Sequence, residues 1–195
     1  MMIGLVLCGG QSSRMGADKG LLNLENRSWV EWALKKCKAV HLETFISIRM
    51  EQMNSYKHFF SIEHFIQDNE SLGYHGPLLG IMSAHKAFPT KDLLVLACDM
   101  IEMKEATLIA LLQMQVSNPS YQAYCFMNQG NLEPLAAIYT ASGLSKIQDL
   151  FLLKDLAKHS MKYVLSVLKT CCIPINPTQQ SSFHNFNTPT DLFNL

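Results

Sequence analysis

Residues 3–19 read IGLVLCGGQSSRMGADK, and the first half of this stretch indicates the fold class. Residues 3–8 form a short, continuous apolar run that stops at Gly9-Gly10. Such a run is typical of a strand whose two faces are both buried, as in a parallel sheet covered by helices. The pattern therefore predicts a central parallel strand that leads into a glycine-rich loop.

Strands and helices alternate along the rest of the chain. Further strands are predicted over residues 44–48, 65–66, 92–97, 122–127 and 135–139, with a short strand in the tail from Ile173. Helices are predicted over residues 29–37, 76–87, 104–115, 142–153 and 161–169. This alternation predicts an α/β fold, a single three-layer α/β/α, Rossmann-like domain over residues 1–195 with a mostly parallel sheet.

Composition argues against several classes of protein. The chain has 16 Lys and Arg against 16 Asp and Glu, and its formal net charge of zero argues against a nucleic-acid-binding face. No apolar run reaches the roughly 18 residues of a membrane helix, and the N-terminal run lacks the basic flank of a signal peptide. We therefore expect no membrane contact and a cytoplasmic location. The six cysteines show no CxxC spacing, so buried free thiols are expected rather than disulfides or a zinc site.

The loop after the first strand carries groups that suit phosphate binding. Gly9 and Gly10 allow the backbone to turn sharply and bring N–H groups close to an anion. Ser12 adds a hydroxyl donor, and Arg14 and Lys19 add positive charge. The spacing matches neither GxxxxGK[ST] nor GxGxxG. The combination favours binding of a nucleoside triphosphate over a surface turn with incidental charges.

Two acidic residues directly follow predicted strands. Asp99 comes after the very apolar strand 92–97, and Asp68 comes after strand 65–66. Ligands of α/β sheets bind beyond the carboxyl ends of the strands, where carboxylates hold Mg²⁺ on nucleotide phosphates. Asp99 is therefore either a candidate Mg²⁺ ligand or an N-cap for a helix near Met103. Asp68 is either a ligand-site carboxylate or a plain turn residue.

The segment near the C-terminus, FHNFNTPTDL at residues 183–192, is the third candidate. If it is extended, Asn185 and Asn187 point to the same side, which would suit amide ligands for a phosphate, a metal or a base. Asn187 or Thr188 could instead cap a short helix with Pro189 in its first turn. Local chemistry alone favours the cap.

Together these motifs resemble those of the MobA-like nucleotidyltransferases. Residues 7–22, LCGGQSSRMGADKGLL, are similar to that family's signature LxGGxSxRMGxDK. The later landmarks follow in the family's order: QDNESLGYHGPLLGI at 67–81, ACDM at 97–100, EPLAAIY at 133–139 and NFNTPTDL at 185–192. The resemblance therefore spans nearly the whole chain.

The resemblance implies transfer of GMP from GTP to molybdopterin, with release of pyrophosphate and with Mg²⁺ as cofactor. It implies that Arg14, Lys19 and Asp99 are catalytic, that Asp99 holds the metal, and that Asn185 and Asn187 line the cleft. The nucleotide-binding residues that it implies are Leu7, Cys8, Gly9, Gly10, Ser12, Arg14, Lys19, Arg49, Asp68 and Asp99. The expected partners are GTP, molybdopterin, and proteins that donate or accept the molybdenum cofactor.

One position departs from the family pattern. Residues 47–52 read SIRMEQ, whereas family members often read S-x-N-R-N-Q, and the first Asn of that pattern helps to recognise guanine. Arg49 stands in its place. Arg can donate to guanine O6 and N7, but also to a cytosine carbonyl, so a cytidylyltransferase stays open. A sugar- or polyol-phosphate nucleotidyltransferase stays open as well, and so does a nucleotide-binding module without turnover.

The acceptor end has weaker signals. Positive charge for a pterin phosphate could come from Lys158, His159, Lys162 and Lys169, although scattered lysines on amphipathic helices are usually solvated. His75 is either a neighbour of the substrate or a plain surface histidine.

Overall fold

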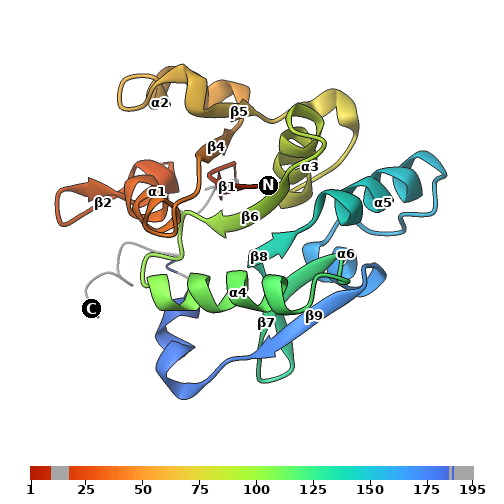
Figure 1. Ribbon diagram of the computed structural model, residues 1–195. Helices are drawn as coiled ribbons and strands as arrows, with labels where there is room; N and C mark the ends of the chain where they lie inside the picture. Colours follow the sequence, from red (N-terminus) through yellow and green to blue (C-terminus); the bar gives the residue numbers. More distant parts are fainter. Residues whose placement is uncertain (10–17, 185, 187–195) are drawn as a thin grey trace.

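The computed structural model describes residues 1–9, 18–184 and 186, which form a sheet with helices on both faces (Figure 1). The strands follow the order β5-β4-β1-β6-β8-β7-β9 across the sheet. Their bounds are β1 Met2–Leu7, β4 Thr44–Ile48, β5 Phe65–Gln67, β6 Asp92–Ala97, β7 Ala123–Asn128, β8 Asn131–Tyr139 and β9 Thr170–Pro174. Within the described ranges, β8 is the strand that runs against the others, because it pairs antiparallel with both β6 and β7. The prediction of a mostly parallel α/β sheet is confirmed.

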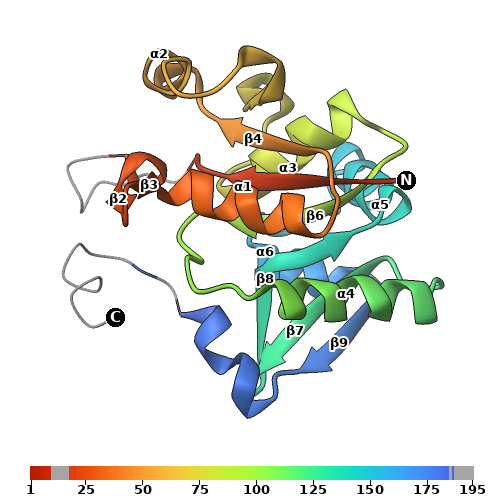
Figure 2. The same cartoon turned by 60° about the vertical axis from the view of Figure 1, so that its left-hand side comes forward.

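The helices form the two outer layers. On one face lie α3 Pro77–Ala87, α5 Ala141–Leu152 and α6 Met161–Val167, packed on inward-facing side chains such as Leu5 and Val95. On the other face lie α1 Trp29–Ala39 and α4 Glu105–Ser117, packed on Val6 and Leu96. Figure 2 shows α1 and α4 in front of the sheet and α3, α5 and α6 behind it. A short helix, α2 Met53–Tyr56, follows β4.

A small hairpin precedes α1 and was not predicted. Its strands β2 Asn23–Leu24 and β3 Arg27–Ser28 are joined by Glu25 and Asn26, which both have positive φ, as a two-residue hairpin turn requires. Ser28 then begins α1 through a capping box, in which its backbone N–H donates to Glu31 Oε2 at 2.7 Å.

The largest departures from prediction lie between β7 and β9. The hairpin turn at Gln129-Gly130 has positive φ at both residues, so β8 begins at Asn131 rather than at residue 135. The pairing register then shifts beside Cys125, because β8 carries extra residues there. The predicted helix over residues 161–169 ends at Val167, and β9 begins at Thr170, earlier than expected, because this segment pairs in parallel with β7.

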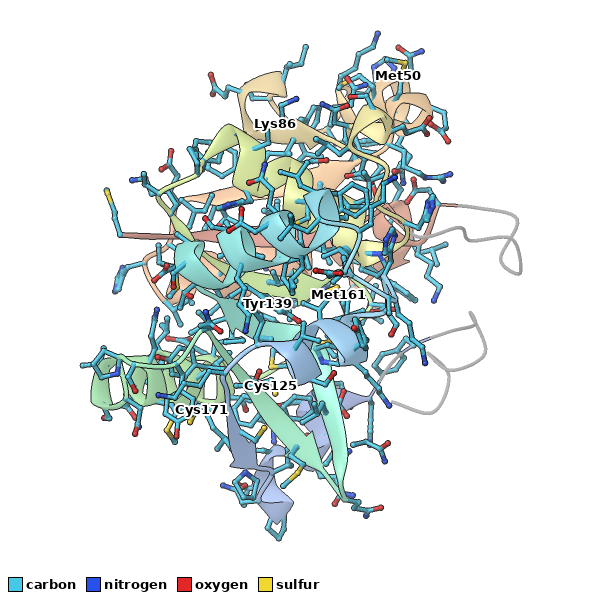
Figure 3. The ribbon with its side chains drawn as sticks, turned by 90° about the vertical axis from the view of Figure 1, so that its right-hand side faces the viewer. Met50, Lys86, Cys125, Tyr139, Met161 and Cys171 are labelled. Carbon is cyan, nitrogen blue, oxygen red and sulfur yellow. The ribbon has the colours of Figure 1, made fainter. Side chains whose placement is uncertain are left out.

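The cysteines are free, as expected, but not all are buried. Cys8, Cys37, Cys98 and Cys125 are buried, whereas Cys172 on β9 is exposed. The expectation of buried thiols is wrong for Cys172 because β9 is the last strand of the sheet, with β7 as its paired neighbour. Figure 3 labels Cys125 on β7 and Cys171 on β9, at the end of the sheet that β9 closes. Within the described residues, no helix has the length and apolar character needed to cross a membrane.

Candidate active site

A pocket of about 660 Å³ lies at the carboxyl ends of β1, β4, β5 and β6. This edge is where the predicted sheet places its ligand, because loops that follow parallel strands converge there. The predicted site residues that line the pocket are Leu7, Cys8, Gly9, Lys19, Arg49, Asp68 and Asp99. Residues from four separate strand ends therefore meet in one cavity.

Asp68 forms the wall of one end of the pocket. Its side chain is buried, and its Oδ1 accepts a hydrogen bond from Ser47 Oγ at 2.7 Å. Burial raises the pKa of the Asp68 carboxyl, while the Ser47 hydrogen bond and the nearby Arg49 charge oppose that rise. Asp68 is thus a buried, hydrogen-bonded carboxylate in the pocket lining, which favours its interpretation as a ligand-site residue over a plain turn residue.

Two glycines allow other elements to approach this carboxylate. A Cβ placed on Gly9 would lie 2.7 Å from Asp68 Oδ2, and a Cβ on Gly80 would lie 2.3 Å from Ser47 Oγ. Both distances are shorter than side-chain atoms tolerate. Ser47 and Gly80 escaped sequence prediction, because their role depends on contacts between β4, β5 and α3 that no local pattern contains.

Arg49 lies beside Asp68, directly after β4. Its Nη1 donates to Glu51 Oε1 at 3.0 Å, and its side chain is 30% exposed. Its Nε is buried and has no hydrogen-bond partner among the described residues. The partly exposed guanidinium of Arg49 therefore lines the pocket, while its Nε lies inside the protein.

Lys19 and Asp99 lie together in the same pocket. Lys19 Nζ is 3.4 Å from Asp99 Oδ2, and the two side chains are 23% and 22% exposed. Burial raises the pKa of Asp99, and the Lys19 ammonium opposes that rise. The helix after Asp99 begins at Glu105 with Lys104 as its N-cap, so the interpretation of Asp99 as a helix cap is wrong.

The C-terminal segment returns to this pair through Phe186. Its backbone N–H donates to Asp99 O at 3.4 Å, and its carbonyl accepts from Lys19 Nζ at 3.5 Å. Its ring packs edge-on against Trp29, with the ring centroids 6.4 Å apart, in a small cluster that includes Ile101. Five predicted site residues, namely Gly10, Ser12, Arg14, Asn185 and Asn187, lie outside the described residues.

Within the described residues, the surroundings of Asp99 fit a Mg²⁺ site that shares its ligands with a substrate. Among the described residues, no group of three or more His, Cys, Asp or Glu side chains converges to hold a metal ion. Mg²⁺ bound to nucleotides commonly uses one or two carboxylates together with phosphate oxygens and water. A single carboxylate beside a lysine fits that mode of binding.

The candidate cations of the acceptor end are only partly brought together. His159 stacks on His75 with ring centroids 5.1 Å apart, next to Gly76 of the pocket lining. Lys169, by contrast, contacts Ser120 Oγ at 3.2 Å and packs over Tyr121, before β7 begins. It is exposed and lies at the amino ends of β7 and β9, opposite the pocket, which favours the alternative of a solvated lysine over a role toward a pterin phosphate.

Known proteins resemble this chain over nearly its whole length. The family model described as the MobA-like NTP transferase domain matches residues 4–170. A probable molybdenum cofactor guanylyltransferase of Methanothermobacter thermautotrophicus is 29% identical over 189 residues, covering 96% of this chain and 95% of the relative. One from a Geobacillus species is 27% identical over 195 residues, covering 97% of this chain and 95% of the relative.

A solved structure matches the fold over almost the full length. The crystal structure of molybdopterin-guanine dinucleotide biosynthesis protein A from Archaeoglobus fulgidus superposes with a TM-score of 0.79 and 25% identity. The match covers 99% of this chain and 96% of the other.

Proposed function

The chain belongs to the MobA-like NTP transferase family, and on this premise we propose that it transfers GMP from GTP to molybdopterin. A phosphate oxygen of molybdopterin attacks the α-phosphorus of GTP, the bond to the β-phosphate oxygen breaks, and pyrophosphate leaves. The names of relatives that align over nearly their whole length support this assignment. The observation that carries it is one pocket with Arg49 and Asp68 at one end and Lys19 with Asp99 at the other.

The polar groups beside Asp68 favour guanine over cytosine. Guanine presents N1–H and N2–H₂ as adjacent donors beside the O6 acceptor. A carboxylate such as that of Asp68 can accept hydrogen bonds from both donors. The Arg49 guanidinium, which lines the pocket and is 30% exposed, is a suitable donor to O6. Cytosine instead presents one amino group beside the N3 lone pair, which would face the carboxylate unfavourably. A site built to pair with donors discriminates strongly against a base that lacks them.

The other end of the pocket suits the triphosphate. The attacking phosphate is already an anion, so the chain needs no strong general base. Lys19 stabilises negative charge that develops on the phosphates as pyrophosphate departs, and Arg14 is proposed to add a second cation. Asp99 is proposed to hold Mg²⁺, which supplies further positive charge when bound. The remaining contribution is alignment of the two reacting groups.

The test is a transfer assay with defined nucleotides. Purified protein is incubated with molybdopterin, Mg²⁺ and either GTP or CTP labelled at the α-phosphate. We expect pyrophosphate release and a labelled dinucleotide with GTP. Product with CTP but not with GTP would overturn the guanylyl assignment and keep the reaction class. Tight GTP binding without product, across molybdopterin and sugar- or polyol-phosphate acceptors, would overturn the transferase assignment.

A second arm tests the metal. Chelation of divalent ions should abolish turnover, and Mg²⁺ should restore it. The Asp99→Asn variant should need a much higher Mg²⁺ concentration, whereas turnover that is insensitive to chelation would reject the proposed metal role.

A further inference from the structure

We propose that Asp18, Gln52 and Tyr56 form a brace that positions Lys19 relative to the Arg49 end of the pocket, an inference that rests on the proposed function. None of the three lines the pocket, so they would act through their neighbours rather than on the substrate. Asp18 immediately precedes Lys19, and the other two belong to the segment that follows Arg49.

The Asp18 carboxylate joins these two segments through both of its oxygens. Its Oδ1 accepts from the Gly20 backbone N–H at 3.0 Å and from Tyr56 Oη at 2.9 Å. Its Oδ2 accepts from Gln52 Nε2 at 2.5 Å. Hydrogen bonds to an ionised acceptor are the stronger class, so this carboxylate fixes the turn that carries Lys19.

The Gln52 side chain extends the connection to the base end. Its Nε2 also donates to Cys8 O at 3.0 Å, and its Oε1 accepts from the Arg49 backbone N–H at 2.8 Å. Gln52 is buried, so these bonds form away from solvent. One amide therefore contacts the end of β1, the segment of Arg49 and the carboxylate next to Lys19.

Tyr56 makes the brace rigid. It is fully buried, and its ring packs against Phe60 and Phe65 with centroids 6.2 Å and 6.4 Å away. The hydroxyl is thus presented from an aromatic cluster that has little freedom to move. A Cβ on Gly20 would lie 2.1 Å from Tyr56 Oη, which shows how closely the Lys19 turn approaches this hydroxyl.

The brace would fix the distance between the Arg49 segment and Lys19, which contact two parts of the same nucleotide. A nucleotide held at Arg49 and Asp68 reaches Lys19 only if the two segments keep their separation. Loss of alignment in an active site reduces turnover steeply, by as much as about a hundredfold for a displacement of about 1 Å. Lys19 is proposed to act on charge that develops during transfer, so kcat should fall more than KM rises.

The test removes one oxygen atom. Tyr56→Phe keeps the packed ring and deletes the hydroxyl that Asp18 accepts from. Tyr139→Phe is the matched control, because Tyr139 is also fully buried and its hydroxyl donates to Pro134 O at 2.9 Å. Tyr139 lies within the core between the sheet, α5 and α6 (Figure 3). We expect kcat to fall roughly tenfold or more for Tyr56→Phe and to stay within about twofold for Tyr139→Phe.

A double-mutant cycle separates positioning from general destabilisation. If Tyr56 acts through Lys19, adding Tyr56→Phe to Lys19→Ala should lower kcat little further. The Asp18→Asn variant, which presents an amide group to Gln52, should fall in kcat in the same way as Tyr56→Phe. Equal effects of the two Tyr→Phe changes, or effects of Tyr56→Phe and Lys19→Ala that multiply, would overturn the brace.

GTP affinity by calorimetry keeps the outcome distinct from failure of the proposed function. A wild-type protein without turnover on any acceptor would reject the transferase assignment. The brace would then be judged on binding alone, by whether Tyr56→Phe weakens GTP affinity in the presence of Lys19 but not in its absence.

Discussion

The substitution Gly80→Ala in the pocket wall should have two opposing effects on the free energy of unfolding. Gly80 is the fourth residue of α3, where alanine is favoured over glycine by about 1 kcal/mol. The new Cβ, however, would lie 2.3 Å from Ser47 Oγ, 3.1 Å from Asp68 Oδ1 and 3.3 Å from Leu7 Cδ2. The Ser47 hydroxyl must therefore rotate away and give up its hydrogen bond to Asp68.

The size of each effect decides the direction. A hydrogen bond to an ionised group contributes about 1.5–3 kcal/mol, which exceeds the helix-propensity gain. We expect Gly80→Ala to lower the free energy of unfolding by about 0.5–2 kcal/mol, the difference between the two. The pKa of Asp68 should rise further without the Ser47 bond, and GTP affinity at neutral pH should fall with it.

Urea denaturation gives the stability change, and titration calorimetry gives the GTP affinity. The control is the pair Ser47→Ala and Ser47→Ala/Gly80→Ala. With the Ser47 Oγ absent, the new Cβ meets Asp68 Oδ1 at 3.1 Å as its nearest neighbour, and the helix-propensity gain should largely return. A Gly80→Ala protein more stable than wild type, or a double variant whose loss equals the sum of the single losses, would refute this reasoning.

Asp99, Asp68 and Phe186 each give a further prediction. Asp99→Asn should reduce turnover by roughly 10²–10³-fold without loss of thermal stability, because burial disfavours the charge that it removes; a pyrophosphate assay and a melting curve check both. Because the folded-state pKa of Asp68 is raised, the nucleotide-free protein should become more stable as pH falls from neutrality toward that pKa, while its GTP affinity weakens. The Asp68→Asn variant should show a weaker pH dependence of both quantities. Urea denaturation across pH measures the stability, and calorimetry across pH measures the affinity. Phe186→Ala should shift the emission of Trp29 and Trp32, the two tryptophans of the chain, and lower turnover, while Phe183→Ala, in a different cluster, should leave the emission nearly unchanged.

Local pattern was sufficient for the parts of the site that follow strands directly. The apolar runs before Gly9, Asp68 and Asp99 indicate buried strands, and a parallel sheet brings their ends to one edge. Fold class and these residues could therefore be predicted without coordinates.

Contacts between distant segments were not predictable in this way. The pairing of Ser47 with Asp68 spans 21 residues, and that of Tyr56 with Asp18 spans 38, with no periodicity that connects them. The direction of β8 was also missed, because an apolar run predicts a strand but not its orientation. For a related reason, the position of Lys169 in a helical pattern does not indicate at which ends of the strands this residue lies.

The contact between Lys19 and Phe186 has a consequence for when the protein becomes competent during its synthesis. The two residues are 167 positions apart, and the strands from β2 to β9 are made between them. Because a domain generally folds as a unit, the site is completed only after Phe186 has been added. The Lys19–Asp99 pair gains its Phe186 contacts last, so a chain that ends before Phe186 lacks the backbone hydrogen bond to Asp99 O and the Phe186 carbonyl that accepts from Lys19 Nζ.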